Sequence, residues 1–390
     1  MATKLFSPLK LRDLTLENRI VVSPMLQHAA ENGVASDWHL MHYGMFSVSG
    51  SGLLITEATA TEPRGRIGPY CMGLYSDEAE KALARIVQFC RKFGKAKLGV
   101  QLAHSGRKGS VPPTWVARRT LTPEEGGWRT VSCSSIDDGV FDVPEVLDQQ
   151  GIEAIIDSWA KATYRAEQIG FDLIELHFAH GYLVNQFLSP LTNKRTDSWG
   201  GTRAGRMNLA LEVFQVCRKA WPACKPMGVR LSAVDWVPGG WDIDDSVVLA
   251  NELKARGCDY ICASSGGVSS KQQIVAGPNY QAPFAERIRS QAGIATIAVG
   301  QITEPRQAEE ILQKGQSDLV ALARRMLFNP RWAWHAAQEL GEDIAYPPRY
   351  QLCHPRMGAK LRAPESQEHT LALLELGKAE EKAGLGRNLA

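Results

Sequence analysis

The sequence has no long apolar run, no paired-cysteine motif and no excess of charge of either sign. No uninterrupted apolar stretch is long enough to cross a bilayer, and the first residues lack the apolar core of a secretory signal. The 44 basic residues nearly balance the 42 acidic ones and form no recurring stripe, so nothing indicates binding to nucleic acid or to an anionic membrane. We therefore expect a cytoplasmic protein that acts on a small molecule, with neither a nucleic-acid nor a membrane partner.

Cysteine is present but scattered. No two of the eight cysteines form a C-x-x-C motif, which is the spacing that zinc sites and many redox sites use. Scattered thiols are typical of a reducing compartment rather than of a disulfide framework. We expect no metal site. The positions are Cys71, Cys90, Cys133, Cys217, Cys224, Cys258, Cys262 and Cys353.

Short β-rich runs alternate with helical patterns along the chain. Near-continuous apolar strands between amphipathic helices indicate a parallel sheet, and eight such units close most simply into a barrel. The expected fold class is α/β, a single (β/α)8 TIM barrel. The expected strands are Ile20–Ser23, Gly52–Ala58, Lys97–Leu102, Leu173–His177, Met227–Ser232, Tyr260–Ser264, Ala295–Val299 and Leu319–Leu322. The expected helices are Asp77–Phe93, Gly151–Ile169, Arg206–Ala220, Asp244–Arg256, Ala282–Gln291 and Pro305–Lys314.

Two segments interrupt this alternation. Residues 105–147 form a long loop after the third strand, rich in Pro, Thr, Gly and Trp, and a loop of that length on a barrel usually shapes the mouth of the site. We expect the barrel to occupy residues 1–355 and a charged C-terminal extension to occupy 356–390, with a helical run at 370–383. A docking helix, an oligomer contact and partial disorder are all compatible with this extension.

The end of the fourth expected strand carries two histidines and a tyrosine. In β/α barrels the side chains at the C-terminal ends of the strands carry the chemistry. His177 and His180 stand three residues apart, and Tyr182 follows two residues later. Neutral imidazoles can hydrogen-bond a carbonyl or nitro oxygen, and a phenol can act as general acid. The alternative is that one histidine is structural and the other solvated.

Other strand ends predict a bound ligand that carries a phosphate group. Gly300 follows the seventh strand, and Ala323 and Arg324 follow the eighth, where barrels often bind phosphate. Arg230 on the fifth strand is a fixed cation that could stabilise a reduced cofactor, and Gln101 on the third could bond a heteroaromatic ring. The alternatives are turn chemistry for the glycine, an ion pair for Arg230 and a structural role for Gln101.

These residues and their neighbours resemble the old yellow enzyme family, especially its bacterial thermophilic-like and xenobiotic-reductase branch. The resemblance covers about residues 4–350. The motifs that carry it are Asn18-Arg19-Ile20, Ser23-Pro24-Met25, Gln101-Leu102-Ala103-His104, Gly106-Arg107-Lys108, His177-Phe178-Ala179-His180-Gly181-Tyr182, Phe187-Leu188-Ser189-Pro190, Asn193-Lys194-Arg195-Thr196-Asp197 and Gly200-Gly201.

The resemblance implies an FMN-dependent enzyme that takes hydride from NADPH or NADH and reduces activated C=C bonds in α,β-unsaturated carbonyl or nitro compounds. Flavin N5 would pass hydride to the substrate, His177 and His180 would bind its oxygen, and Tyr182 would protonate it. Nicotinamide and substrate would use one pocket in turn, and we expect a homo-oligomer, a dimer or tetramer. The FMN-binding positions would be Ser23, Pro24, Met25, Ala58, Gln101, Arg230, Gly300, Ala323 and Arg324.

Three positions depart from the pattern of that branch. Leu26 stands where a cysteine usually touches the flavin, and His28 stands where a tyrosine usually helps to bind the substrate oxygen. Both are expected to shape the substrate pocket, and the imidazole of His28 is expected to titrate near neutral pH. Leu352 stands where a tail arginine often reaches a neighbouring subunit, and Arg356 is its nearest substitute.

Three rival functions are compared with this one. Relatives with an iron–sulfur cluster need several cysteines after the barrel, and only Cys353 lies there. A flavin-dependent dehydrogenase or demethylase without a cluster stays open. A metal-dependent hydrolase could use His177 and His180 as ligands, but it needs a carboxylate, and Glu175 is expected to point to the opposite side of its strand.

Overall fold

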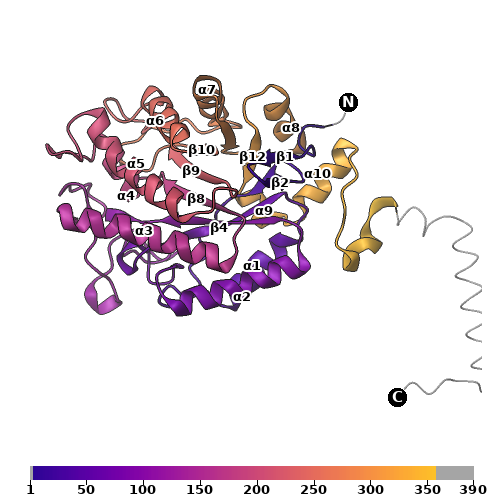
Figure 1. Ribbon diagram of the computed structural model, residues 1–390, viewed down its shortest axis with the longest axis horizontal. Helices are drawn as coiled ribbons and strands as arrows, with labels where there is room; N and C mark the ends of the chain where they lie inside the picture. The colour runs from indigo at the N-terminus through magenta and orange to yellow at the C-terminus, as the bar shows by residue number, and fades with distance from the viewer. Residues whose placement is uncertain (1–2, 357–390) are drawn as a thin grey trace, which may run out of the picture. The chain divides into compact units, whose positions relative to one another are not determined.

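The computed structural model of the protein describes residues 3–356, so the helical run expected at 370–383 lies outside the described residues. The chain divides into two compact units, of which the first is Met1–Glu342 and the second begins at Asp343. In the first unit, eight parallel strands close into a barrel (Figure 1). The expected (β/α)8 fold is therefore confirmed, whereas the domain boundary expected at residue 355 stays a prediction.

Each barrel strand coincides with one expected run, within two residues at either end. The strands follow chain order around the barrel, and β12 closes the circle by pairing with β3, where Val320 lies opposite Ile20. Parallel order places every C-terminal strand end at the same mouth. The strands are β3 (Ile20–Val22), β4 (Leu53–Ala60), β5 (Lys97–Ala103), β8 (Leu173–Phe178), β9 (Met227–Ser232), β10 (Tyr260–Ser264), β11 (Ala295–Val299) and β12 (Leu319–Leu322).

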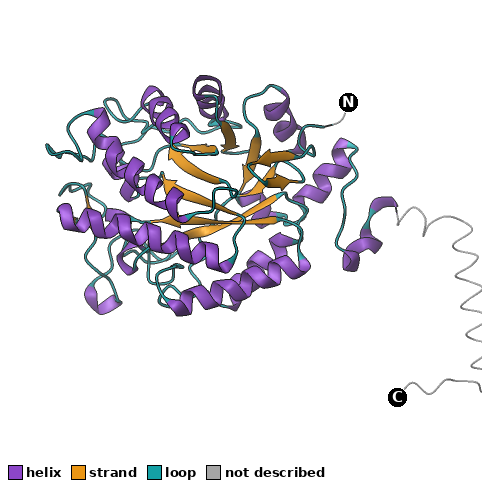
Figure 2. Ribbon diagram, in the orientation of Figure 1, coloured by secondary structure: helices purple, strands orange, loops and turns teal. Residues whose placement is uncertain are grey.

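Helices surround the strands (Figure 2), and the six expected helices are present. Among residues 3–356, none of the helices has the length and apolar composition that a membrane span needs. The helices are α1 (Asp37–Ser47), α2 (Asp77–Phe93), α3 (Gln149–Ile169), α4 (Leu183–Leu188), α5 (Arg203–Ala220), α6 (Ile243–Ala255), α7 (Ala282–Ala292), α8 (Pro305–Gln313), α9 (Arg324–Phe328) and α10 (Trp332–Leu340).

Helix α1 has no apolar stripe, which is why the sequence pattern does not predict it. Its buried residues include His39, His42 and Tyr43, whereas Trp38 and Met41 are exposed. Polar side chains inside and apolar side chains outside reverse the pattern by which an amphipathic helix is identified. Buried polar contacts, described below, hold this helix against the barrel.

A hairpin near the N-terminus covers the bottom of the barrel. Strands β1 (Leu9–Leu11) and β2 (Leu14–Leu16) pair antiparallel, and Leu11 and Leu16 belong to an apolar cluster that also contains Leu173 at the start of β8. Because apolar packing closes this end, the mouth is the open end of the barrel in the described residues. The remaining short elements are β6 (Val131–Ser132), β7 (Glu145–Val146) and the 3-10 turns η1 (Pro63–Gly65), η2 (Gly106–Lys108), η3 (Pro123–Glu125) and η4 (Pro348–Cys353).

The inner layer of the barrel offers a direct test of this packing. A Cβ atom at Gly228 would lie 2.2 Å from ring atoms of the fully buried Tyr260. We expect Gly228→Ala to lower the free energy of unfolding by about 1–3 kcal/mol because the ring has no room to move. Urea denaturation measures this value. Gly277→Ala is the matched control, because nothing lies within 4 Å of its added Cβ atom, and equal losses in both variants would contradict the packing argument.

Candidate active site

Two imidazoles and one phenol meet at the C-terminal end of β8. Nδ1 of His180 lies 3.2 Å from Nε2 of His177, and Nε2 of His180 lies 2.7 Å from Oγ of Ser264 on β10. The rings of His177 and Tyr182 contact each other edge to face, with centroids 5.0 Å apart. The structure therefore brings the three expected catalytic residues together at the barrel mouth.

The backbone after β8 turns sharply to produce this cluster. His180 and Gly181 have φ angles of +61° and +71°, in the left-handed region that favours glycine. A Cβ atom at Gly181 would lie 2.1 Å from the carbonyl oxygen of Gly267, so only glycine fits there. The backbone N–H of His180 donates to Oγ of Ser232 at 2.8 Å, which fixes the turn against β9.

Burial keeps the two imidazoles neutral and the phenol protonated. It lowers the pKa of His177 and of His180 well below the usual range, and nearby Arg230 adds to the effect. Burial also raises the pKa of Tyr182. The N–H of Ala179 donates to Nδ1 of His177 at 3.2 Å, so the proton of that neutral ring lies on Nε2. The site therefore presents neutral hydrogen-bond donors and one undissociated acid.

Charged and amide side chains lie beside the imidazoles inside the barrel. Arg230 on β9 is buried, and its Nη1 donates to Oγ of Ser23 at 3.1 Å. Its buried Nε has no hydrogen-bond partner among residues 3–356. Nε2 of Gln101 donates to Oε1 of Glu175 at 2.7 Å. Burial raises the pKa of Glu175, and the positive charge of Arg230 opposes that rise.

The position of Glu175 corrects one expectation. Alternate residues of a strand point to the same side, and Glu175 bonds Gln101 and interacts with Arg230 inside the barrel. The expectation that Glu175 points away from His177 is therefore wrong. Within residues 3–356, no group of three or more His, Cys, Asp or Glu side chains is arranged to hold a metal ion.

A cavity of about 690 Å³ gathers the residues expected at the phosphate. Gly300, Ala323 and Arg324 line it, and so does Arg230, which is expected to stabilise the reduced cofactor. Gly300 has a φ angle of +115°, and a Cβ atom there would lie 2.6 Å from Nε2 of Gln281, so the chain can approach a ligand closely at this point. Arg324 is exposed and forms no ion pair with any residue in the described range, which leaves its guanidinium available to an anion.

The loop after β3 is tied to the barrel at two points. The N–H of Ser23 donates to the carbonyl of Leu322 at 2.9 Å, and the N–H of Gln27 donates to Oε2 of Glu57 at 2.9 Å. The pairing of β4 with β5 skips Glu57, which forms a bulge beside Ala58. Sequence reasoning missed Glu57, although a carboxylate inside the apolar run of β4 was a visible signal. The other expected residues of this loop, Pro24, Met25 and Leu26, are half-buried.

His28 also lies on this loop, in a left-handed conformation with φ +51°. Its Nδ1 lies 4.0 Å from Sγ of Cys71, and its ring contacts that of Trp115 edge to face, with centroids 5.3 Å apart. Burial lowers the pKa of His28, opposed by Glu57, which moves its titration away from neutral pH. The sequence did not predict that Trp115, on the long loop after β5, lies beside His28. Only the Trp-rich composition of that loop was visible.

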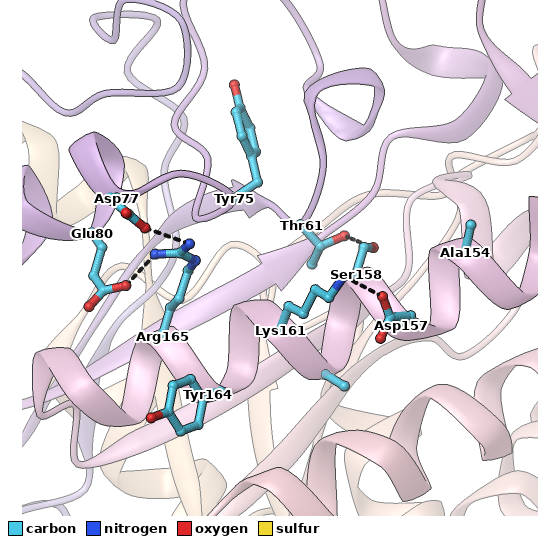
Figure 3. A pocket seen from close by; sticks show the side chains of 11 residues that line it. Thr61, Tyr75, Asp77, Glu80, Ala154, Asp157, Ser158, Lys161, Tyr164 and Arg165 are labelled. Carbon is cyan, nitrogen blue, oxygen red and sulfur yellow. Dashed lines mark hydrogen bonds and ion pairs between the residues drawn. The ribbon is translucent and has the colours of Figure 1, made fainter.

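A larger cavity, of about 900 Å³, lies between α2 and α3 on the outside of the barrel (Figure 3). Arg165 there forms ion pairs with Asp77, at 2.7 Å, and with Glu80. Lys161 pairs with Asp157 at 2.7 Å. The charged side chains of this outer cavity are thus paired with one another, and none of the expected site residues lines the cavity. The strand ends are therefore the candidate active site.

Comparison with known sequences shows the family to which the chain belongs. The chain matches the NADH:flavin oxidoreductase / NADH oxidase family over residues 4–343. It is 41% identical over 350 residues to the NADPH dehydrogenase of Listeria monocytogenes serotype 4b (strain CLIP80459), covering 89% of this chain and 98% of that protein. It is 42% identical over 353 residues to the NADPH dehydrogenase of Geobacillus sp. (strain WCH70), covering 90% and 98%. The chain belongs to this flavin oxidoreductase family.

Solved structures show the same fold. Morphinone reductase in complex with tetrahydroNAD has a TM-score of 0.73 and 25% identity, covering 89% of this chain and 94% of that one. A 2-naphthoyl-CoA reductase in complex with 2-naphthoyl-CoA has a TM-score of 0.78 and 20% identity. This chain spans about half the length of that reductase, at 53% coverage, and the likeness concerns the fold alone.

These findings define an FMN-dependent NAD(P)H oxidoreductase of the old yellow enzyme family. The expected cofactor, FMN, and the expected reductant, NADPH or NADH, are confirmed. The resemblance seen in the sequence motifs is confirmed as well, while the roles of the individual site residues stay predictions.

The described residues fit FMN at both ends of the ligand. The cavity that Gly300 and Arg324 line is also lined by Arg325 at this end and by Arg230 deeper in the barrel, and the buried Nε atom of each has no hydrogen-bond partner in residues 3–356. A phosphate carries several strong acceptors and negative charge, which such donors recognise. Arg324 would hold the phosphate, Arg230 would lie by the ring, and FMN would supply reversible hydride chemistry.

This fit makes a prediction for Arg324. We expect Arg324→Ala to weaken FMN binding by about 10- to 100-fold, because a charge-assisted hydrogen bond to the phosphate is lost. Quenching of flavin fluorescence during titration of the apoprotein measures the dissociation constant. Arg306→Ala is the control, since Arg306 is exposed and pairs with Glu339 at 3.3 Å outside this cavity. Unchanged FMN affinity in Arg324→Ala would remove this residue from the phosphate site.

Proposed function

We propose that the enzyme reduces the C=C bond of α,β-unsaturated carbonyl or nitro compounds with electrons from NADPH or NADH. The observation that supports this most directly is the cluster of two neutral imidazoles and one protonated phenol at the end of β8. Donors bind and polarise a substrate oxygen, and the acid completes the reduction. Neither role is needed if the flavin only passes electrons to oxygen or to another protein.

The histidines are suited to bind the oxygen of such a substrate. The proton on Nε2 of His177 faces Nδ1 of His180 at 3.2 Å in the free protein, which places the remaining proton of His180 on Nε2. A carbonyl or nitro oxygen entering the site accepts these N–H groups in place of the protein acceptors. As negative charge develops on that oxygen, these hydrogen bonds strengthen, and the cation of Arg230 lies in the same buried region.

Tyr182 is suited to protonate the α-carbon. Its hydroxyl carries its proton at neutral pH, and its ring is held against His177. FMN, when bound, supplies hydride to the β-carbon, so the acid and the hydride source act on adjacent carbons. Nicotinamide and substrate use this one pocket in turn, which predicts ping-pong kinetics.

The two departures from the family pattern on the loop after β3 are proposed to line the substrate pocket. Leu26 places an aliphatic side chain where a thiol usually lies, and His28 places an imidazole beside Trp115. We propose that these two positions set which substituents on the alkene the pocket accepts. We also propose a homo-oligomer of the cytoplasm, as is usual in the family that the sequence motifs identify.

Substitution of Tyr182 tests the proposed acid. We expect Tyr182→Phe to slow reoxidation of the reduced enzyme by an enone about 10²- to 10⁴-fold, the usual contribution of a general acid. Flavin reduction by NADPH needs no proton from Tyr182 and should stay at the wild-type rate. Anaerobic stopped-flow absorbance separates the two half-reactions. Tyr164→Phe is the control, because that ring is 60% exposed on α3; equal losses in both half-reactions would contradict the assigned role.

Substitution of the histidine pair tests the proposed oxygen site. Phenolic ligands resemble the substrate oxygen and change the flavin absorption spectrum when they bind. We expect the double variant His177→Ala/His180→Ala to weaken phenol binding at least about tenfold, because hydrogen bonds to a buried phenolate are lost. The exposed His335→Ala is the control. A spectral titration that matches the wild type would exclude the pair as the oxygen site.

A further inference from the structure

Lys108 links two loops of the active site. It lies in η2, just after β5, and its Nζ donates to the carbonyl of His180 at 2.7 Å and to the carbonyl of Gly267 at 3.0 Å. His180 belongs to the loop after β8, and Gly267 belongs to the loop after β10. One ammonium group therefore joins three strand ends.

The two loops that Lys108 joins are in direct backbone contact. Gly267 has a φ angle of +99°, and a Cβ atom there would lie 2.4 Å from the carbonyl carbon of His180. The two carbonyl oxygens point to the same Nζ atom, and a cation offsets the repulsion between them. The left-handed turn at His180, which sets the direction of Tyr182, is thus stabilised from the β5 side.

The same ammonium group lies over the ring of the proposed acid. Nζ of Lys108 is 5.3 Å from the centroid of Tyr182, within the range of a cation–π contact. A positive charge near a phenol favours its phenolate form. The ammonium group over the ring therefore favours release of the proton. It acts in the same direction as the charge of Arg230 and against burial, which raises the pKa of Tyr182.

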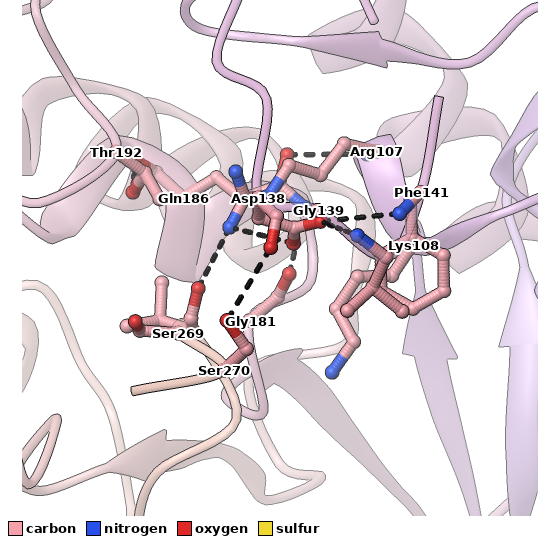
Figure 4. Close-up of polar contacts among 12 residues, drawn as sticks. Arg107, Lys108, Asp138, Gly139, Phe141, Gly181, Gln186, Thr192, Ser269 and Ser270 are labelled. Carbon is pink, nitrogen blue, oxygen red and sulfur yellow. Dashed lines mark hydrogen bonds and ion pairs between the residues drawn. The ribbon is translucent and has the colours of Figure 1, made fainter. Parts of the chain in front are cut away.

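A neighbouring ion pair keeps Lys108 in place. Arg107 is buried, donates to the carbonyl of Val268 at 2.7 Å and pairs with Asp138 at 3.3 Å (Figure 4). The carbonyl of Asp138 accepts a hydrogen bond from Oγ of Ser270 at 3.3 Å. Asp138 lies on the long loop after β5, so that loop fixes the turn in which Lys108 lies.

We propose that Lys108 is a positioning residue for proton transfer, which orients Tyr182 through the carbonyls of His180 and Gly267 and promotes loss of the Tyr182 proton through its charge. This inference rests on the proposed function, since it assumes that Tyr182 protonates the substrate. The inference assigns a role to the Gly106-Arg107-Lys108 motif. Neither the proposed oxygen site nor the flavin site includes this motif.

The charge on Lys108 makes the proposal dependent on pH. Burial lowers the pKa of Lys108 to about 8, with further lowering from Arg118 and Arg107 and a partial rise from Asp138. As pH rises through about 8, Lys108 loses its proton, the stabilisation of the phenolate is lost, and proton transfer slows. The charged or titratable groups that face Lys108 are Arg107, Arg118, Asp138, His177, His180 and Tyr182.

The test compares Lys108→Met, which removes the charge, with Lys108→Arg, which keeps it, in the FMN-loaded enzyme. At pH 7 we expect Lys108→Met to slow enone-driven reoxidation on the order of tenfold, the size of a buried cation–π contact. The wild-type rate should fall as pH rises through about 8, and Lys108→Arg should abolish that fall because arginine stays charged. Lys225→Met is the control, since it removes a cation–π contact with Trp221 away from the site.

A double variant separates this role from general structural damage. If Lys108 acts through Tyr182, Lys108→Met should cause no further loss in the Tyr182→Phe background. Equal losses in both backgrounds, or a fall near pH 8 that persists in Lys108→Arg, would overturn the inference. If Lys108→Met does not bind FMN, the pH dependence of the Lys108→Arg rate tests the inference by itself. A wild-type enzyme that accepts hydride from NADPH but never reduces an enone would instead overturn the proposed function, and the inference with it.

Discussion

A buried positive charge dominates this active site. Arg230 lies inside the barrel on β9, opposite His177 of β8, and neighbouring groups offset the cost of burying its charge. Glu175 supplies a compensating carboxylate on the neighbouring strand, and Ser23 accepts one of its N–H groups. The cost of burying a second cation keeps His177 and His180 neutral. Neutral rings are what a hydrogen-bond donor pair for a substrate oxygen requires.

The residues that stabilise the barrel and the residues of the candidate site lie at opposite ends of the barrel axis. Apolar residues fill the lower interior, where the N-terminal hairpin closes it, and Leu173 begins β8, the strand that carries His177 near its other end. Further along the same inner face, Glu175 and His177 are polar. This gradient follows from the parallel arrangement, because each strand passes from the closed end to the open one. The polar groups at the open end are therefore available to bind a ligand, because the apolar layer at the closed end stabilises the fold.

The parts of this protein that the sequence predicted are those set by local pattern. Barrel strands are buried on both faces, so they appear as apolar runs, and His177, His180 and Tyr182 were identifiable because they follow such a run. Helix α1 was missed because its inward groups are polar. Lys108 appeared only as part of a motif, since its partners lie 72 and 159 residues away in the chain. Contacts of that kind exist only once the barrel has closed. Glu175 was misplaced, although it stands two residues before His177 on β8 and therefore points to the same side of the strand.

The contact between Glu57 and Gln27 has a consequence for how this pocket can change. The hydroxyl of Tyr43 on α1 donates to the other oxygen of Glu57 at 3.1 Å, and Nε2 of His39 on the same helix lies 3.0 Å from that oxygen. The backbone between Leu26 and His28 is thereby anchored to a helix that takes no part in the reaction. Side chains at those two positions can diversify over evolution, or in a directed library, while the main chain that presents them keeps its course. The proposed substrate pocket can thus change its side chains while its backbone stays fixed.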